Sequence, residues 1–324
     1  MAPLIYSTSP LSGAGIAELA ALCDLRVVDA GAGLCATNAP AYLRHCRGLL
    51  CLLGDRIDRA LLDGMPELEF VSSVSVGVDH VDLQALTERA IPLGHTPGVL
   101  VDATADTAFA LLLAAARRVA EADRFVRAGG WREEGRWRPD FFLGKDVSGA
   151  TLGIVGLGAI GQAVARRAAA FGMRVVAWSR SGREVAGVEN VSLEALLLRS
   201  DFVSVHVALC EATRNLLDAD RIAMMKPGAV LVNTARGGIV DESALAAALD
   251  EDRLFAAGLD VFAQEPLAAD NPLLHHPRVV FTPHIGSATR LTRAAMMHIA
   301  IENALAAVQG RRMPHCVNPE VYGA

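Results

Sequence analysis

The chain has 324 residues, 52% of them apolar, and this length predicts two domains or one large domain with an insertion. A formal net charge of −6 without a long basic run argues against a nucleic-acid partner, and the longest apolar block, residues 108–116, is too short to span a bilayer. No signal peptide is visible and the six cysteines show no metal-ligand spacing, so we expect a cytoplasmic protein without a metal site or membrane association.

The first hundred residues predict a smaller α/β domain, because short apolar runs alternate with helical stretches. The strand-like runs cover residues 3–6, 25–28, 48–53 and 70–74. A glycine turn follows the last of them and would leave the backbone N–H groups of Val76 and Gly77 unpaired, ready to bind a carboxylate. Taken alone this segment is a turn, and we expect the nearby His80 to be a surface or helix-capping residue.

A long helix is predicted from Ala103 to about Ala128, ended by Gly129 and Gly130. Its nearly continuous apolar positions indicate burial between layers and a connection between domains. Residues 131–144 then form a predicted loop rich in Trp, Arg and Phe. Such aromatic side chains indicate a partner surface or packing onto the domain itself.

The next segment has the G-x-G-x-x-G spacing of a dinucleotide-binding turn. A strand at residues 152–155 precedes it, a helix at residues 162–171 follows it, and a second strand at residues 174–178 completes the βαβ unit. The first glycine allows the tight turn, the second lets a pyrophosphate approach the backbone, and the third lets helix and strand pack closely. The residues expected to contact the cofactor in this turn are Gly156, Gly158, Ala159, Ile160 and Gly161.

The residues after the second strand select the cofactor. An NAD-binding unit carries an acidic residue here, which accepts hydrogen bonds from the ribose 2′-hydroxyl. This chain instead offers two guanidinium groups that suit a 2′-phosphate, with two serine hydroxyls beside them. These residues are Ser179, Arg180, Ser181 and Arg183. They predict NADP(H) as the cofactor, with a solvated basic loop as the alternative interpretation.

Beyond this unit, short apolar strands and helices alternate again and predict a doubly wound parallel sheet. The strands cover residues 201–206, 229–233, 256–259 and 279–282, and the helices cover residues 193–198, 242–249 and 291–309. Ligands bind beyond the carboxyl ends of such strands. At these ends the chain has Arg236, Asp260 with Glu265 beyond it, and His284.

Each of these polar side chains has a structural interpretation as a surface arginine, a helix-capping acid or a hydrogen-bonded loop histidine. Together they suit hydride transfer to a 2-oxo acid. The guanidinium would bind the carboxylate and the carbonyl, and the imidazole would protonate the nascent alkoxide. A carboxylate beside the imidazole would hold its tautomer and favour its protonated form.

Five motifs make the chain resemble the D-isomer-specific 2-hydroxyacid dehydrogenase family over nearly its whole length. They are GLGAIG at 156–161, NTARGG at 233–238, GLDVF at 258–262, EP at 265–266 and PHIGS at 283–287. The resemblance implies two Rossmann-like α/β domains with doubly wound parallel sheets, a cleft between them, and a homodimer. The substrate-binding domain would comprise residues 1–101 and 287–324, and the dinucleotide-binding domain residues 102–286.

The resemblance also assigns roles to single residues. Arg236 would bind and polarise the substrate, His284 would be the acid and base, and Glu265 would pair with His284. Further substrate contacts fall on Val76, Gly77, Leu100, Ser287 and Trp137, the last in a loop that reaches the partner subunit's active site in related reductases. Further cofactor contacts fall on Thr104, Val207, Thr234, Ala235, Asp260 and Gly286.

Within the family, residues 95–100, 284–289 and 316–319 most resemble glyoxylate/hydroxypyruvate reductases of the 2-ketogluconate reductase type. We therefore expect NADPH-dependent reduction of glyoxylate or hydroxypyruvate, with 2-ketogluconate as a further candidate. Ala208 and Asp106 depart from the family pattern, which usually has Pro and Glu there. The alternatives are a phosphoglycerate- or phosphite-type dehydrogenase, and a non-catalytic nucleotide-sensing interaction protein.

Overall fold

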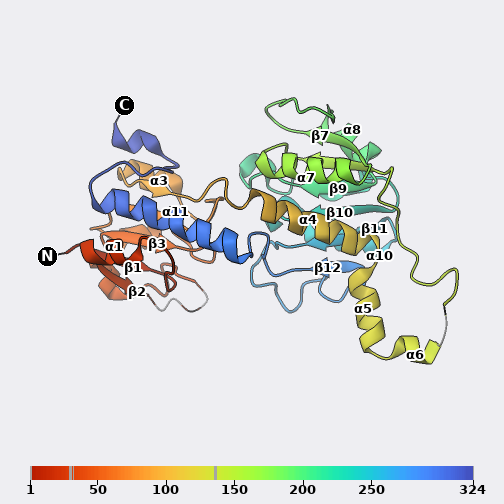
Figure 1. Ribbon diagram of the computed structural model, residues 1–324, viewed down its shortest axis with the longest axis horizontal. Helices are drawn as coiled ribbons and strands as arrows, with labels where there is room; N and C mark the ends of the chain where they lie inside the picture. The colour runs from red at the N-terminus through yellow and green to blue at the C-terminus, as the bar shows by residue number, and fades with distance from the viewer. Residues whose placement is uncertain (1, 29–30, 32, 135–136, 324) are drawn as a thin grey trace. The chain divides into compact units, whose positions relative to one another are not determined.

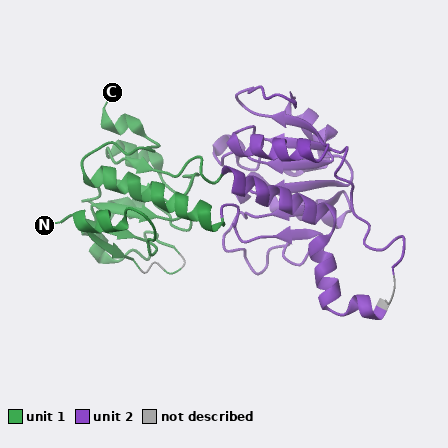
Figure 2. Cartoon of the chain, in the orientation of Figure 1, with its two compact units in different colours: residues 1–100, 288–324 green, residues 101–287 purple. Residues whose placement is uncertain are grey.

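The computed structural model describes residues 2–28, 31, 33–134 and 137–323 and divides into two compact units (Figures 1 and 2). Unit 1 comprises Met1–Leu100 with Ala288–Ala324, and unit 2 comprises Val101–Ser287. Each unit contains one sheet of parallel strands with helices packed on it, which confirms the prediction of two parallel-sheet α/β domains. Among these residues, no helix combines the length and the apolarity that a membrane crossing requires.

Unit 1 is built on a five-stranded sheet in the order β2-β1-β3-β4-β5. Its strands are β1 (Leu4–Ser7), β2 (Asp24–Val27), β3 (Gly48–Cys51), β4 (Phe70–Ser73) and β5 (Leu93–Gly94), and its helices are α1 (Ile16–Leu22), α2 (Arg59–Asp63), α3 (Leu83–Glu88) and α11 (Arg290–Val308). The carboxyl-terminal helix α11 packs against β3 and β4, where Ile301 and Ala304 are buried with Ile5 and Phe70. The predicted helix near the end of the chain therefore returns to the first unit.

Unit 2 contains a seven-stranded sheet in the order β12-β11-β10-β9-β6-β7-β8. Its strands are β6 (Thr151–Val155), β7 (Arg174–Trp178), β8 (Val188–Asn190), β9 (Phe202–Val205), β10 (Ala229–Asn233), β11 (Leu254–Leu259) and β12 (Val279–Phe281). Its helices are α4 (Val101–Ala116), α5 (Val119–Arg127), α6 (Gly130–Glu134), α7 (Ala159–Ala170), α8 (Leu193–Arg199), α9 (Ala219–Met224) and α10 (Glu242–Asp250). Because all seven strands are parallel, their carboxyl ends lie along one edge of the sheet.

The sheet of unit 2 is buried on both faces, which explains why its strands are almost continuously apolar. Alternate side chains enter two separate cores. Ile154 and Phe202 pack under α4 and α7, whereas Val155 and Val203 pack under α8, α9 and α10. Figure 1 shows α4 and α7 lying over one face of the sheet. Asp106 of α4 accepts a hydrogen bond from the Arg167 guanidinium of α7 at 2.7 Å, so this departure from the family pattern still joins the two helices.

The single long helix predicted from residue 103 to about residue 128 is wrong: it is two helices, α4 and α5. The chain returning from the 131–144 segment ends α4, because the Lys145 N–H donates to the Ala116 carbonyl at 2.8 Å. Arg118 then adopts a left-handed backbone conformation with φ of 54°. The predicted 131–144 loop is also partly helical, since α6 spans Gly130–Glu134.

The aromatic side chains of the same segment divide between the two predicted interpretations. Phe141 and Phe142 pack against Phe125 of α5 in edge-to-face and tilted arrangements, with ring centroids 5.6 and 5.1 Å away. Trp131 and Trp137 are instead 56% and 77% exposed. The segment thus packs on its own unit through its phenylalanines and presents its tryptophans to solvent.

Candidate active site

The glycine turn between β6 and α7 has the geometry that a bound pyrophosphate requires. Gly156 has φ of 105°, and a Cβ there would lie 2.7 Å from the His206 carbonyl carbon. A Cβ on Gly161 would lie 2.1 Å from the Gly156 carbonyl oxygen, whereas the Cβ position of Gly158 faces open space. Within the described chain, the N–H groups of residues 157–161 have no backbone or side-chain acceptor. The amino end of α7 is therefore free to bind an anion.

Two buried hydroxyl groups at the same sheet edge lack partners among the described residues. The Oγ of Ser179, directly after β7, and the Oγ1 of Thr234, directly after β10, are inaccessible to solvent and make no hydrogen bond. Buried hydroxyls of this kind are normally satisfied, so an unsatisfied pair beside an anion-binding turn fits a bound polar ligand. The sequence predicted both residues as cofactor contacts, and these orphaned groups are what a nucleotide would satisfy.

The segment after β7 contains no carboxylate between residues 179 and 183. Arg180, Ser181 and Arg183 are exposed, and the Arg183 carbonyl accepts a hydrogen bond from the Asn190 side chain at 2.9 Å. This contact anchors the backbone of the segment while its guanidinium groups stay in solvent. Val207, another predicted cofactor contact, places its Cγ1 2.8 Å from where a Gly156 Cβ would be.

Arg236 lies in a turn that the last residue of β10 organises. The buried Asn233 side chain donates to the Arg236 carbonyl at 2.9 Å and accepts from the Ala235 N–H at 3.0 Å. The next residue, Gly237, fits against the Phe262 backbone so closely that a Cβ would lie 1.8 Å from its carbonyl carbon. The turn after β10 is thus packed directly against the segment that carries Glu265.

Glu265 joins this segment to His284. Its Oε1 accepts the Phe262 N–H at 2.9 Å, and its Oε2 lies 2.7 Å from Nδ1 of His284. Burial alone would raise the pKa of the Glu265 carboxyl, but the hydrogen bonds from His284 and Phe262 and the charges of His284 and Arg236 hold that pKa below its ordinary value. An ionised carboxylate can only accept, so Nδ1 of His284 carries a proton and Nε2 is the nitrogen left for a substrate.

The loop that carries His284 is held by Asp260, which is only 1% exposed. One carboxylate oxygen accepts the Thr282 hydroxyl at 2.5 Å and the Ile285 N–H at 2.8 Å, and the other accepts the Gly286 N–H at 2.8 Å. His284 itself has φ of 55°, a conformation that a residue with a Cβ rarely adopts. Strained backbone that is held in this way is typical of functional positions.

Thr104 of α4 lies beside the same loop. Its Cγ2 is 3.3 Å from the Cβ position of Gly286, and its side chain is buried. Apart from Trp137, which follows α6, the predicted site residues of unit 2 therefore gather at the carboxyl edge of its sheet, in the glycine turn, beside Thr104 and in the loops after β7, β9, β10, β11 and β12. Ser287, at the end of the unit, is half-buried.

The predicted substrate contacts Val76, Gly77 and Leu100 belong to unit 1. Val76 and Gly77 follow β4, and the N–H groups of both have no acceptor in the described part of the chain. The predicted alternative that His80 caps a helix is wrong, because the N-cap of α3 is Asp82. His80 is half-buried, and its Nε2 lies 3.1 Å from the buried Ser73 hydroxyl. The two-residue spacing of Ser73 and Ser75 puts both hydroxyls on one face of the strand end, and this pattern could have indicated their contact with His80.

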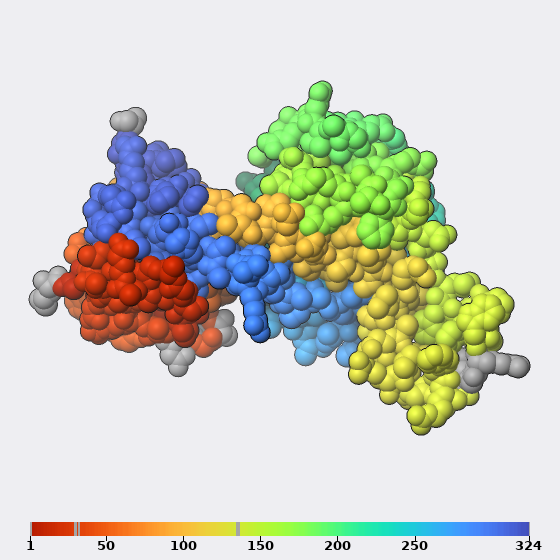
Figure 3. Space-filling view, viewed as in Figure 1, coloured from red at the N-terminus to blue at the C-terminus, as the bar shows by residue number. Residues whose placement is uncertain are grey.

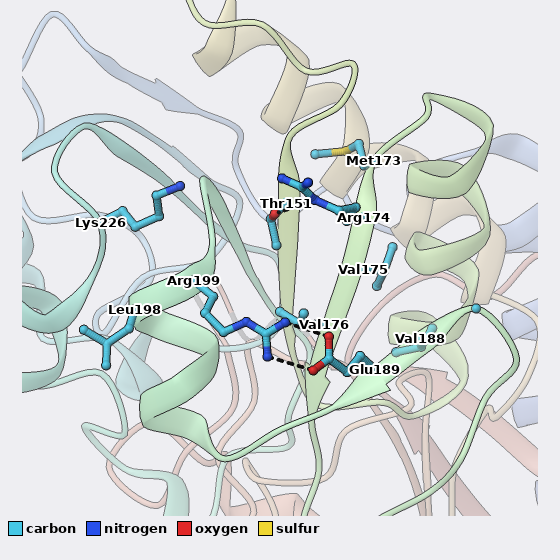
Figure 4. Close-up of a pocket in the computed structure, with 11 residues that line it drawn as sticks. Thr151, Met173, Arg174, Val175, Val176, Val188, Glu189, Leu198, Arg199 and Lys226 are labelled. Atoms are coloured by element: carbon cyan, nitrogen blue, oxygen red, sulfur yellow. Dashed lines mark hydrogen bonds and ion pairs between the residues drawn. The ribbon is translucent and has the colours of Figure 1, made fainter.

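A separate cavity of about 890 Å³ opens at the opposite edge of the same sheet (Figure 4). It is lined by the first residues of β6 and β7, Thr151 and Arg174, and by the end of α8. Its other charges are neutralised locally, since Arg199 pairs with Glu189 at 2.6 Å and Lys226 with Asp201 at 2.5 Å. Ligands of open parallel sheets bind at the carboxyl ends instead, so we assign the candidate site to that edge.

Comparisons with known proteins agree with the geometry. Residues 109–286 match the family model for the D-isomer-specific 2-hydroxyacid dehydrogenase, NAD binding domain. A glyoxylate reductase of Korarchaeum cryptofilum is 48% identical over 283 residues, which is 86% of this chain and 85% of that protein. A solved structure of a Thermus thermophilus protein is 46% identical with a TM-score of 0.89, over 97% of this chain and 99% of the other.

A second solved structure is an NADPH-dependent glyoxylate/hydroxypyruvate reductase from Sinorhizobium meliloti, in complex with NADP and malonate. It is 32% identical to this chain with a TM-score of 0.88, and the match covers 98% of each chain. Similarity of this extent places the whole chain, and not one domain of it, within a single group of relatives.

Proposed function

Because the chain belongs to the D-isomer-specific 2-hydroxyacid dehydrogenase family, we propose that it reduces glyoxylate or hydroxypyruvate with NADPH to the corresponding 2-hydroxy acid, which is the D-isomer where the product is chiral. The observation that carries the proposal is the 2.7 Å pair of His284 and Glu265 beside the Arg236 turn, at the sheet edge that also holds the glycine turn. The names of the relatives, glyoxylate reductase and glyoxylate/hydroxypyruvate reductase, support this substrate class. 2-Ketogluconate is a further, larger candidate.

The chain's own residues would activate the carbonyl of the substrate. Arg236 would bind the carboxylate and polarise the 2-oxo oxygen through its planar fork of donors. His284 would donate the proton on Nε2 to that oxygen and keep the proton on Nδ1, which Glu265 holds in place. The nicotinamide, when bound, would supply the hydride to the 2-oxo carbon. Thr104, Asp260 and Gly286 would line its site from the His284 loop and α4.

NADPH is the proposed cofactor because of the segment after β7. Arg180 and Arg183 provide two exposed guanidinium groups, and no carboxylate between residues 179 and 183 would repel a 2′-phosphate. The buried, unpartnered Ser179 hydroxyl provides a neutral donor beside them. The glycine turn and the loops at Val207, Thr234 and Ala235 would hold the rest of the nucleotide.

Unit 1 would bind the substrate through backbone amides. The N–H groups of Val76 and Gly77, which have no acceptor among the described residues, suit a carboxylate, and Leu100 would contribute an apolar contact. In this assignment residues 1–101 and 287–324, with Ser287 at the junction, form the substrate-binding domain, and residues 102–286 form the dinucleotide-binding domain.

We also propose a homodimer in which α5 and α6 meet a second copy. None of the residues of α5 is buried, and the exposed Trp131 and Trp137 lie in the same segment. Apolar patches of this kind on a folded unit mark contact surfaces. Trp137 would then contact the substrate bound by the partner. The protein would act in the cytoplasm.

A spectrophotometric panel tests the function. The oxidation of NADPH and of NADH is followed with glyoxylate, hydroxypyruvate, pyruvate and 2-ketogluconate as substrates. We expect glyoxylate or hydroxypyruvate with NADPH to give the highest kcat/KM. Equal kcat/KM for the two nucleotides would overturn the NADPH assignment, and NADPH binding without turnover of any 2-oxo acid would indicate a nucleotide sensor instead.

A further inference from the structure

The orientation of the unpaired amides after β4 is fixed by side chains behind them. In a trans peptide, the carbonyl of one residue and the N–H of the next point in opposite directions. A donor that binds the carbonyl therefore fixes where the following N–H points. The backbone carbonyls of residues 75, 76 and 77 each accept a hydrogen bond from a donor in unit 1.

The first two bonds orient the N–H groups of Val76 and Gly77. The Ser75 carbonyl accepts the Thr96 N–H at 2.8 Å, so the Val76 N–H points to the other side. The Val76 carbonyl lies 3.2 Å from Nδ1 of His95, which must carry a proton because a carbonyl only accepts. This contact therefore points the Gly77 N–H away from His95.

His95 is itself well fixed for this task. Its backbone N–H donates to the His315 carbonyl at 3.0 Å, and its carbonyl accepts the Asn303 side chain at 3.0 Å. Both partners lie in the carboxyl-terminal part of unit 1. The imidazole thus approaches Val76 from a backbone that is anchored on both sides.

The third carbonyl, that of Gly77, is held by a chain of hydroxyl groups. The hydrogen bonds of this chain can be donated in only one direction. The Ser75 hydroxyl donates its only proton to the Gly77 carbonyl at 2.8 Å. The Ser73 hydroxyl, 2.7 Å away, must therefore donate to Ser75, and Nε2 of His80, at 3.1 Å from Ser73, must donate to Ser73. Both serines are buried, at 0% and 1% exposure, so water does not compete for these bonds.

We propose that His95 and Ser75 are positioning residues for the carboxylate of the substrate. His95 holds the peptide between Val76 and Gly77, and Ser75 holds the next peptide, between Gly77 and Val78, and so limits rotation of the glycine. The inference rests on the proposed function for the identity of that carboxylate. Without these anchors the peptides can rotate, and a rotated peptide presents a carbonyl oxygen, which repels an anion. The two residues therefore determine affinity for 2-oxo acids without touching the reacting atoms.

The test compares two substitutions of His95. His95→Asn keeps an N–H donor at the position of Nδ1, whereas His95→Leu removes the donor at similar bulk. We expect His95→Leu to raise KM for glyoxylate and the inhibition constant of oxalate together by about tenfold, with kcat and KM for NADPH nearly unchanged, and His95→Asn to restore most of both. Equal KM values for the Leu and Asn variants, or a fall in kcat alone, would overturn the proposal.

Ser75→Ala provides a second measurement that does not depend on His95. It removes the bond to the Gly77 carbonyl without adding bulk, so we expect a similar parallel rise of the two constants. An unchanged oxalate constant in a folded Ser75→Ala protein would contradict the role of the hydroxyl chain. If the wild-type protein fails to reduce glyoxylate, the proposed function is wrong, but calorimetric binding of oxalate to the same variants in the presence of NADPH still decides whether the anchors act.

Discussion

At the scale of single residues, His284 and Glu265 govern how the proposed reaction depends on pH. The proposed reduction takes a proton from the His284 imidazolium, which the ionised carboxylate of Glu265 stabilises. The depressed pKa of Glu265 keeps its carboxylate ionised, and the rate should decline only below about pH 4.3, the ordinary pKa of Glu. The same depressed pKa stabilises the fold above that pH, and this contribution is lost as the pH falls through the folded-state pKa. Initial rates in overlapping buffers measure the profile.

Removing the carboxylate should slow the reaction at every pH. Glu265→Gln keeps the size of the side chain but cannot stabilise an imidazolium, so we expect kcat to fall at least about a hundredfold. Glu251→Gln, on an exposed residue after α10, serves as the matched control and should leave kcat unchanged. A Glu265→Gln enzyme with a wild-type pH profile would argue against the pairing.

The two groups proposed to contact the substrate should be needed individually. His284→Ala removes the proton donor and Arg236→Ala removes the guanidinium, and each should lower kcat/KM for glyoxylate at least about a hundredfold. NADPH affinity, followed by nucleotide fluorescence, should change little in the His284 variant. Near-normal turnover in either variant would contradict the mechanism.

His206 should make the stability of the fold depend on pH. Burial lowers the pKa of its imidazole to about 4. Between the ordinary value of 6.5 and about 4 the unfolded chain therefore binds a proton that the folded chain does not, and stability falls as the pH falls through this window. The full shift corresponds to about 3 kcal/mol. Urea unfolding at pH 7 and pH 4.5 should show this loss in the wild type and a smaller loss in His206→Gln. An equal loss of unfolding free energy in both proteins would show that His206 is not the source of this pH dependence.

At the scale of elements, α10 supports the segment that carries Glu265. Glu242, in the first turn of α10, accepts the Ala263 N–H and the Asn271 side chain, both at 2.6 Å. Its two oxygens therefore join an early and a central part of the loop between β11 and β12, on either side of Glu265. We expect Glu242→Ala to lower kcat about tenfold through a less well held Glu265, with a smaller effect on KM for NADPH. Steady-state kinetics with glyoxylate measure both quantities.

A neighbouring residue provides the control for this substitution. Ser243 is the next residue of α10 and is exposed, so Ser243→Ala changes the same helix without touching the loop. A Glu242→Ala protein that melts lower but keeps its kcat would show that the contact is purely structural.

The elements that the sequence predicts well are those whose signal is local. Strands β7 and β10 coincide with their predicted bounds because continuous apolar runs end there at turn residues. The break between α4 and α5 was not predictable in this way, because it depends on Lys145, which returns to Ala116 from far along the chain. The two-residue strand β5 was also missed, since it is defined by pairing with β4.

The same distinction applies to the candidate site. Arg236 and His284 could be predicted because polar residues at the carboxyl ends of parallel strands share one edge of the sheet. His95 and Glu242 could not, because each acts by holding the backbone of a distant segment, and nothing in the neighbouring sequence indicates the partner. The spacing of residues in the sequence predicts which groups meet at the ends of strands. Contacts that position a distant backbone segment can be identified only from the folded structure.

At the scale of the whole molecule, the arm formed by α5 and α6 sets the expected assembly. Figure 1 shows these two helices extending away from the sheet of unit 2, and their atoms project from the body of that unit in the space-filling view (Figure 3). Val119, Val126 and Trp131 are each at least half exposed on this arm. A stable homodimer would bury these side chains, because apolar groups are enriched in the cores of such interfaces.

Size-exclusion chromatography with light scattering should therefore give twice the mass of one chain for the wild type. Val126→Glu and Trp131→Glu each place a charge in the proposed interface, and burying an unpaired carboxylate is costly, so both should elute with the mass of one chain. Leu198→Glu is the matched control, since Leu198 is 57% exposed on α8, outside the arm, and its variant should remain a dimer. A wild-type monomer, or arm variants that stay dimeric, would show that α5 and α6 do not form the interface. If Trp137 completes the partner's substrate site, the monomeric variants should also show a raised KM for glyoxylate.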